Sequence, residues 1–215
     1  EPRLVAEVGE EARAEGPVRM FAGDLRQKLA ITNLLSATMD AFERVDILVN
    51  ASRQCALSDP LDLESDAVEE LWQQNVLTSL RLSQMAAKRM IQKAEKTGAE
   101  GMIGSIINLS SLSALRTQPQ LLGYSISCAA VEQMTRSLAV VLAPKGIRVN
   151  AVRPGFIYTD MHAAGGEPGR VDRLKSRIPL GRGGEAIEVA EAIAWLASGA
   201  ASFTTGSFID VCGGV

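Results

Sequence analysis

Short runs of β-branched and aliphatic residues alternate with longer stretches of helical periodicity along almost the whole chain. Residues 45–50 and 147–152 are near-continuous apolar runs, typical of strands that are covered on both faces of a parallel sheet. Residues 27–43 and 121–143 instead repeat apolar side chains at the spacing of an amphipathic helix. This alternation predicts an α/β fold with a doubly wound parallel sheet. A length of 215 residues fits one domain over 1–215.

The same patterns predict the remaining elements. We expect helices at 2–15, about 63–96 and 185–198, and strands at 18–22, 105–110 and 208–212. The segment 156–183 is rich in Gly and lies beyond the predicted strand ends. We expect it to form a mobile lid over a substrate, with one short helix.

Charge and residue usage exclude several classes of function. The chain has 22 Lys and Arg against 25 Asp and Glu, a net charge of −3, and no basic stripe that would favour nucleic acid or an anionic membrane. No apolar run reaches the ~18 residues of a membrane span. Cys55, Cys128 and Cys212 are far apart, which predicts free thiols in a reducing, cytoplasmic compartment. Because His162 is the only histidine, no metal site or Ser/His/Asp triad is expected.

Residues with reactive or hydrogen-bonding side chains stand at the predicted carboxyl ends of the strands or in the helices that follow. In chain order they are Asn50-Ala51-Ser52, Asn75, Ser111, Tyr124, Pro154-Gly155 and Thr159. Singly, each has an ordinary explanation, since a Ser after a strand usually caps a turn and a Tyr near a helix start usually packs half-buried. Ligands of open parallel sheets bind beyond the carboxyl ends of the strands, so the ordered set is a candidate site.

The ordered set resembles the short-chain dehydrogenase/reductase family, which couples a Rossmann-type sheet to hydride transfer with NAD(P)(H). The resemblance covers about residues 2–214, and 3-oxoacyl-carrier-protein reductases are among the most similar members. The stretches that match best are 104–111, 146–155, 178–182 and 188–190. The resemblance implies an NAD- or NADP-dependent oxidoreductase that interconverts a small-molecule carbonyl and a secondary alcohol.

The resemblance also implies a role for individual residues. Ser111 would hold the substrate oxygen, Tyr124 would donate or accept the proton, and Asn75 would anchor a water in the proton relay. Contacts with the cofactor are implied for Asp24, Leu25, Asn50, Ala51, Ser52, Pro154, Gly155, Ile157 and Thr159. Hydride transfer is the chemistry of the cofactor itself, for which the protein supplies orientation and a proton.

Three departures from the family pattern bear on this function. The family's Tyr-x-x-x-Lys reads Tyr124-Ser-Ile-Ser-Cys128, so Cys128 stands in the place of the lysine on the same helix face. The family's Asn-Asn-Ala-Gly reads Asn50-Ala-Ser-Arg53, which puts a side chain where the backbone normally approaches the cofactor. The family's first strand, Gly-rich turn, following helix and second strand have no counterpart. The strand at 18–22 would therefore lack its inner partner, and the choice between NAD and NADP stays open.

Cys128 leaves two functions open. The chain is either an active oxidoreductase, or a catalytically silent member of the same fold that acts in binding or assembly. Arg53 and Arg153 could approach a phosphate or a substrate anion, but solvent-exposed side chains are the commoner case. The helices at 63–96 and 121–143 have more apolar surface than one sheet face needs. In the resembled family such helices pair across a two-fold axis, so a homodimer or homotetramer is expected.

Overall fold

Four parallel strands form the centre of the molecule, in the order β1-β2-β3-β6. We describe them in a computed structural model that covers residues 18–62 and 67–215. The strands are β1 (Ile47–Asn50), β2 (Gly104–Leu109), β3 (Ile147–Pro154) and β6 (Phe208–Val211). Asn50 pairs with Asn108, and Val152 pairs with Ile209, so the carboxyl ends of the strands meet at one edge. The predicted doubly wound parallel sheet is therefore confirmed.

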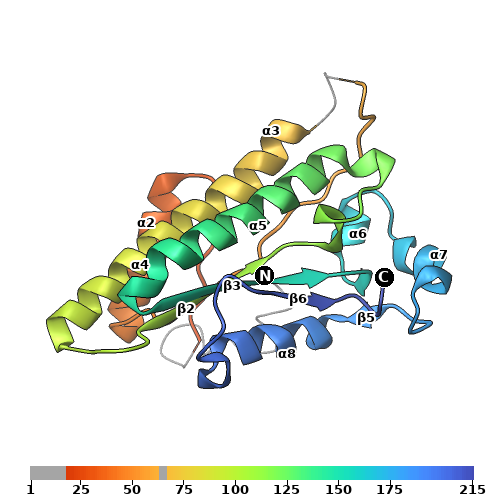
Figure 1. The fold of residues 1–215 in the computed structure, drawn as a ribbon. Coiled ribbons are helices and arrows are strands. Elements are labelled where there is room, and N and C mark those ends of the chain that lie inside the picture. The colour runs from red at the N-terminus through yellow and green to blue at the C-terminus, as the bar shows by residue number, and fades with distance from the viewer. Residues whose placement is uncertain (1–17, 63–66) are drawn as a thin grey trace.

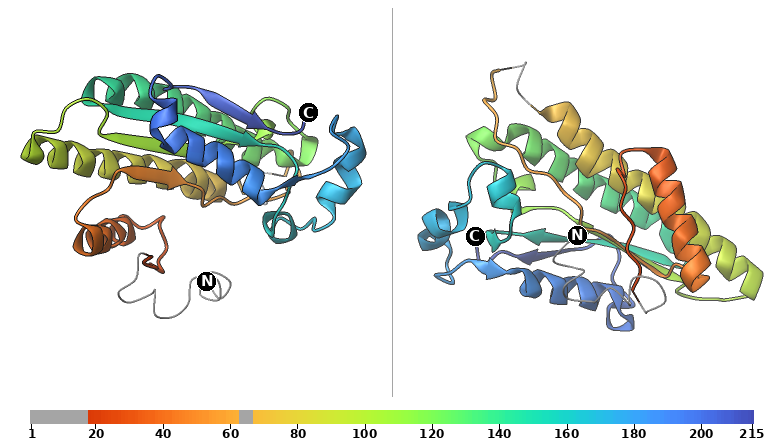
Figure 2. Two further views of the ribbon diagram at one scale, coloured as in Figure 1. Left: turned by 90° about the horizontal axis from the view of Figure 1, so that it is seen from below. Right: turned by 180° about the vertical axis from the view of Figure 1, so that it is seen from behind.

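Helices cover both faces of this sheet. The long ones are α2 (Lys28–Phe42), α4 (Thr78–Thr97), α5 (Leu122–Leu142) and α8 (Ala186–Ala197), and the short ones are α3 (Val68–Leu71), α6 (Met161–Ala164) and α7 (Arg170–Leu174). Figure 1 shows α4 and α5 side by side over one face of the sheet and α8 over the other, and Figure 2 shows the same layers from below and behind. The predicted helices 27–43, 121–143 and 185–198 agree with α2, α5 and α8. The helix predicted at 2–15 lies outside the described residues.

The core is divided by the sheet because successive strand residues point to opposite faces. Ile106 packs in a cluster with side chains of α2, α4 and α5, such as Leu35 and Leu82. Its neighbour Ile107 packs with Val189 and Leu196 of α8. The aliphatic runs of β2 and β3 are thus buried on both sides, as a parallel sheet requires.

The helix predicted at about 63–96 is not uniform. Residues 63–66 lie outside the described part, and α3 is followed by a π-helical turn, Trp72–Leu77, before α4 begins. The backbone N–H of Thr78 bonds to the carbonyl of Gln73, five residues earlier. Such turns are rare and occur often at functional sites. Asn75 lies within this one and is buried.

The strand predicted at 18–22 is wrong, because residues 18–24 form no regular element. A strand needs a neighbour for its backbone groups, and among the described residues β1 pairs with β2 alone. Ile47 and Val49 of β1 are 51% and 39% exposed. Without a partner on that side, the β-prone residues before α2 stay irregular.

The segment 156–183 has more structure than the single short helix predicted. It contains α6, α7 and β4 (Ile157–Tyr158), which pairs with β5 (Gly184–Glu185). Arg170 of α7 is buried and donates to Gln118 Oε1 at 2.6 Å, which ties this segment to the loop before α5. The mobility of the segment stays a prediction.

The stretch Pro119–Lys145, which contains α5, is long and apolar enough by length and composition to cross a membrane. One side of this stretch packs against the sheet. Glu132 on α5 is 3% exposed and pairs with Arg153 of β3 at 2.6 Å.

Candidate active site

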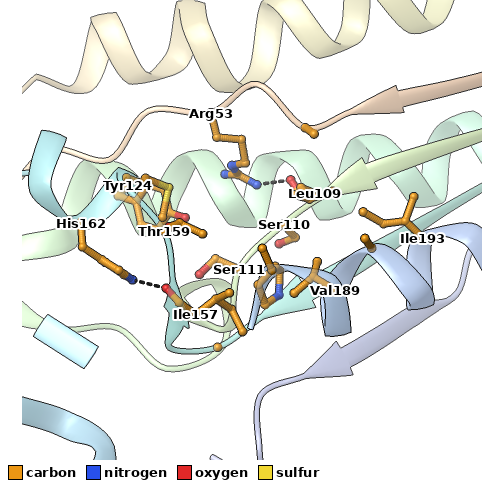
Figure 3. A pocket seen from close by; sticks show the side chains of 16 residues that line it. Arg53, Leu109, Ser110, Ser111, Tyr124, Ile157, Thr159, His162, Val189 and Ile193 are labelled. Carbon is orange, nitrogen blue, oxygen red and sulfur yellow. Dashed lines mark hydrogen bonds between the residues drawn. The ribbon is translucent and has the colours of Figure 1, made fainter. Parts of the chain in front are cut away.

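A cavity of about 350 Å³ opens at the carboxyl ends of the strands, between the loop after β1, the start of α5 and helix α8 (Figure 3). Ligands of open parallel sheets bind at this edge. The sequence-predicted residues that line the cavity are Ala51, Ser111, Tyr124, Pro154, Gly155, Ile157 and Thr159. The fold therefore brings together residues that lie more than 100 positions apart in the chain.

Ser111 and Tyr124 place two hydroxyl groups on the wall of this cavity (Figure 3). Ser111 follows β2, and its Oγ accepts a hydrogen bond from Ser113 N–H at 3.2 Å. Tyr124 lies in the first turn of α5 and is 4% exposed. Burial raises the pKa of the Tyr124 phenol, and the charge of Arg53 and the Ser111 hydroxyl oppose that rise. At neutral pH the phenol is therefore protonated.

Arg53 reaches into the same cavity from the loop after β1 (Figure 3). Its guanidinium donates to the backbone oxygen of Leu109 and to Cys128 Sγ, the latter at 3.1 Å. Its Cζ lies 5.5 Å from the centre of the Tyr124 ring. The expectation that Arg53 and Arg153 are solvent-exposed is wrong, because Arg53 is enclosed by these groups and Arg153 pairs with Glu132.

Cys128 lies one helical turn after Tyr124 and is fully buried. It packs in a cluster with Leu71, Leu121 and Tyr124 beneath the cavity wall. Burial raises the pKa of its thiol, and Arg53 opposes that rise. The group in the place of the family lysine is thus a neutral thiol at pH 7.

The predicted Asn50 and Asn75 are buried beside the cavity and are hydrogen-bonded inside the protein. Asn50 Nδ2 donates to Asn108 Oδ1 at 2.8 Å. Asn75 Oδ1 accepts from Gln54 N–H and its Nδ2 donates to Gln54 O, both at 2.9 Å, and Nδ2 also donates to Ser127 Oγ at 3.1 Å. Asn75 therefore holds the loop that follows Arg53 against α5. Its relay role stays a prediction.

Four predicted cofactor contacts do not line the cavity: Asn50, which is buried beside it, and Asp24, Leu25 and Ser52. The Asp24 carboxylate accepts hydrogen bonds from the backbone N–H and from the guanidinium of Arg26. Asp24 lines a separate hollow beside the start of α2. Leu25 packs against the core cluster of that helix. Ser52 Oγ accepts a hydrogen bond from Gln74 Nε2 at 3.2 Å.

Further walls of the cavity come from α8 and from α6, which lies in the predicted lid segment. Val189 and Ile193 of α8 face it one turn apart, a spacing that the helical pattern of the sequence could have indicated. His162 lines it from α6, with Nε2 2.9 Å from the Ile157 carbonyl oxygen, and burial lowers its pKa. No sequence pattern pointed to the contact between Arg53 and Cys128, which are 75 positions apart.

Comparisons with known proteins agree with this geometry. A family model described as enoyl-(acyl carrier protein) reductase matches residues 2–215. The chain is 41% identical over 207 residues to the uncharacterized oxidoreductase YgfF of Escherichia coli, covering 94% of this chain and 81% of that protein. It is 34% identical over 203 residues to the 3-oxoacyl-[acyl-carrier-protein] reductase FabG of Thermotoga maritima, covering 93% and 78% respectively.

Solved structures give the same result. The fold matches a 3-ketoacyl-(acyl-carrier-protein) reductase from Brucella melitensis complexed with NADH, with a TM-score of 0.85 and 28% identity over 99% of this chain and 82% of that chain. It also matches a putative gluconate dehydrogenase from Agrobacterium tumefaciens, with a TM-score of 0.84 and 27% identity over 100% of this chain and 82% of that chain.

Proposed function

Because the chain belongs to the short-chain dehydrogenase/reductase family, whose members are NAD(P)-dependent oxidoreductases, we propose that it interconverts a carbonyl compound and a secondary alcohol by hydride transfer. The observation that best supports this reaction is the pair of hydroxyls of Ser111 and Tyr124 on the wall of one cavity. The second candidate is a catalytically silent member that acts in binding or assembly. It is favoured by the neutral thiol of Cys128 in the place of the family lysine.

The cavity fits the nicotinamide end of NAD or NADP. Its volume of about 350 Å³ lies within the range of small-molecule sites, and its walls are mostly apolar. The Nε of Arg53 is buried and has no hydrogen-bond partner among the described residues, so one donor of this guanidinium is left unpaired at the cavity wall. Pro154, Gly155, Ile157 and Thr159 would hold the nicotinamide. When bound, the cofactor supplies or accepts the hydride.

Tyr124 would move the proton. In reduction, the neutral phenol donates its proton from Oη to the substrate oxygen, which the Ser111 hydroxyl holds in place. In oxidation, the phenolate accepts the proton from the alcohol. Since burial raises the pKa of Tyr124, the phenol form dominates at pH 7 and favours the reducing direction.

The segment 156–183 would close over the substrate. Met161 and His162 of α6 line the cavity, so movement of this segment would change access to Ser111 and Tyr124. Loops that sequester an active site from water are common in enzymes. Amide hydrogen exchange in 156–183 should slow when cofactor is added, and equal exchange with and without cofactor would count against a lid.

The proposal includes assembly into a homodimer or homotetramer. Apolar side chains of α5 face outward in the single chain, and they are Leu122, Ile126, Val140 and Val141. Leu122 and Ile126 lie near the start of the helix and Val140 and Val141 at its end, and we expect these two exposed apolar pairs to mark sites of association.

Two measurements test the proposed reaction. Titration with NADH and NADPH, followed by tryptophan fluorescence, should detect binding through Trp195, which lies on the helix that lines the cavity. With a panel of carbonyl compounds, Tyr124→Phe should lower kcat by about 10²-fold or more while cofactor affinity is kept.

The other tyrosine provides the matched control. Tyr158 donates to Asp172 at 2.9 Å and does not line the cavity, so Tyr158→Phe should leave kcat close to that of the parent. A folded protein that binds no nicotinamide cofactor, or a Tyr124→Phe variant that keeps the full rate, would overturn the proposed reaction.

A further inference from the structure

We propose that Arg53, rather than a residue of α5, supplies the positive charge beside the Tyr124 phenol and is a positioning residue of the reaction. The two sequence departures at positions 53 and 128 then belong together: the cation is presented from the loop after β1 instead of from the helix. This inference rests on the proposed function for its chemical meaning, but its main test needs no turnover.

The guanidinium of Arg53 is fixed between the tyrosine and the cysteine. It donates to Cys128 Sγ at 3.1 Å, and its Cζ lies 5.5 Å from the centre of the Tyr124 ring. A further hydrogen bond joins it to the backbone oxygen of Leu109, at the end of β2. Figure 3 shows the side chain pointing from its loop into the cavity, toward Leu109.

The loop that bears Arg53 is itself held in place. Both backbone groups of the next residue, Gln54, bond to the amide of Asn75 at 2.9 Å. The same amide bonds to Ser127, which precedes Cys128 on α5. Arg53 is therefore anchored at its backbone and at its guanidinium, so the charge is presented without reorganisation.

The charge of Arg53 acts directly on the phenol. The groups that influence Tyr124 are Arg53 and Cys55 from the loop after β1, Ser111 after β2 and Cys128 on α5, while His162 faces the same cavity from α6. A guanidinium stays protonated in proteins, whereas burial raises the pKa of both thiols and lowers that of His162. A nearby cation favours the phenolate over the phenol.

The thiol at position 128 is part of the same arrangement. A lysine there would bring an ammonium against the guanidinium, and two enclosed like charges in contact are unfavourable. The short side chain of Cys128 instead accepts a hydrogen bond from Arg53. The site thus has room for a cation at position 53 or at position 128, but not at both.

A fluorinated tyrosine tests the charge directly. Trifluorotyrosine placed at position 124 alone has a more acidic phenol than tyrosine, and fluorine NMR reports its ionisation. Arg53→Met should raise the titration midpoint by about one pH unit or more, whereas Arg53→Lys should restore most of the difference. Arg44→Met is the control, since Arg44 pairs on the surface with Asp46 at the other end of β1, and it should cause no shift.

Moving the cation from position 53 to position 128 tests whether the two positions exclude each other's charge, and it does so even if Arg53→Met does not fold. Cys128→Lys should lower the Tm of the parent protein strongly, but much less when combined with Arg53→Gly. The double variant should also have a lower titration midpoint at position 124 than Arg53→Gly alone. An unchanged midpoint in Arg53→Met, or an equal loss of Tm from Cys128→Lys in both backgrounds, would overturn the inference.

Kinetics separate this inference from the proposed function. Arg53→Met should lower kcat for alcohol oxidation at pH 8 by about tenfold or more and displace the pH profile upward, with the substrate KM nearly unchanged. Reduction, which uses the neutral phenol, should suffer less. A parent protein that turns over no carbonyl compound would refute the proposed function, and the fluorine titration would still decide whether Arg53 acts on Tyr124.

Discussion

Tyr124 is surrounded by groups that shift the pKa of its phenol in opposite directions. Burial raises the pKa of the phenol, while Arg53 and the Ser111 hydroxyl lower it, and the net result is a pKa above the ordinary value near ~10. Cys128 and Cys55 are thiols at neutral pH because burial raises their pKa as well. The Tyr124 phenol is thus protonated at neutral pH, so in the reaction that we propose the rates of the two directions should depend on pH.

Alcohol oxidation should rise with pH from 7 to 10, because it needs the phenolate and the raised pKa of Tyr124 keeps that form scarce at neutral pH. Carbonyl reduction should be nearly level between pH 6 and 8, where the phenol is fully protonated. Initial rates in both directions at saturating cofactor test this. An oxidation rate that is flat from pH 7 to 9, with a hydride isotope effect showing that chemistry limits it, would contradict the assignment.

At the scale of the elements, one buried ion pair joins helix α5 to the sheet. Arg153 of β3 bonds to both carboxylate oxygens of Glu132, at 2.6 and 2.8 Å, and to Asp210 of β6 at 3.0 Å. Ser110 also donates to Glu132. Because Ser110 lines the cavity and Arg153 directly precedes the lining residue Pro154, the pair fixes α5 relative to the strand ends that present the site.

Glu132→Gln should lower the free energy of unfolding by about 3–5 kcal/mol, because it leaves the enclosed Arg153 without its main counter-charge. Burial acts to raise the pKa of Glu132, but the bonds from Arg153 and Ser110 hold it below the usual value. The stability gained from the ionised carboxylate is therefore present at neutral pH and is lost as the pH falls through that lowered pKa. Denaturant unfolding at pH 7 measures the effect of the substitution, and a series from pH 7 down to pH 2 measures the loss on protonation.

An exposed carboxylate provides the control for this measurement. Glu95→Gln on α4 should change the free energy of unfolding by less than about 0.5 kcal/mol. A loss below about 1 kcal/mol in Glu132→Gln would show that the ion pair is not what joins α5 to the sheet.

Periodicity predicted the long helices and the four strands of the parallel sheet. It succeeded because packing on the sheet agrees with local preference, most clearly along α2, α5, α8, β2 and β3. It failed at residues 18–22, where a β-prone run has no partner, since pairing depends on residues far away in the chain. It could not predict the π-helical turn at Asn75, which has no simple sequence pattern. Family resemblance predicted seven of the sixteen residues that line the cavity, and it placed position 53 near the cofactor. It did not predict the contact of Arg53 with Cys128, which arises from the tertiary fold alone.

At the scale of the whole molecule, a large part of α5 has no covering layer. Val140 and Val141 are 77% and 65% exposed, although the other side of the same helix is buried against the sheet. Exposing apolar side chains of this kind to water is unfavourable. We propose that a second copy of the chain covers this face of α5.

The double substitution Val140→Asp with Val141→Asp should shift the protein toward the monomer in light scattering at micromolar concentration. At a two-fold interface each new aspartate occurs once in each copy of the chain. The free-energy cost of burying these like charges in the dimer is therefore large. Leu29→Asp on α2, which alters an equally exposed leucine on another helix, should leave the assembly unchanged. A parent protein that is already a stable monomer would refute the proposed dimer.

The contact between Arg53 and Cys128 also limits how a site of this kind can change during evolution. A chain that gains an arginine at position 53 before it loses a lysine at position 128 passes through a state in which two cations repel each other. In the reverse order it passes through a state with no cation beside the tyrosine. Both single steps should be selected against, so positions 53 and 128 are expected to vary together among relatives. This coupling predicts that aligned relatives have a basic residue at one of the two positions, but rarely at both or at neither.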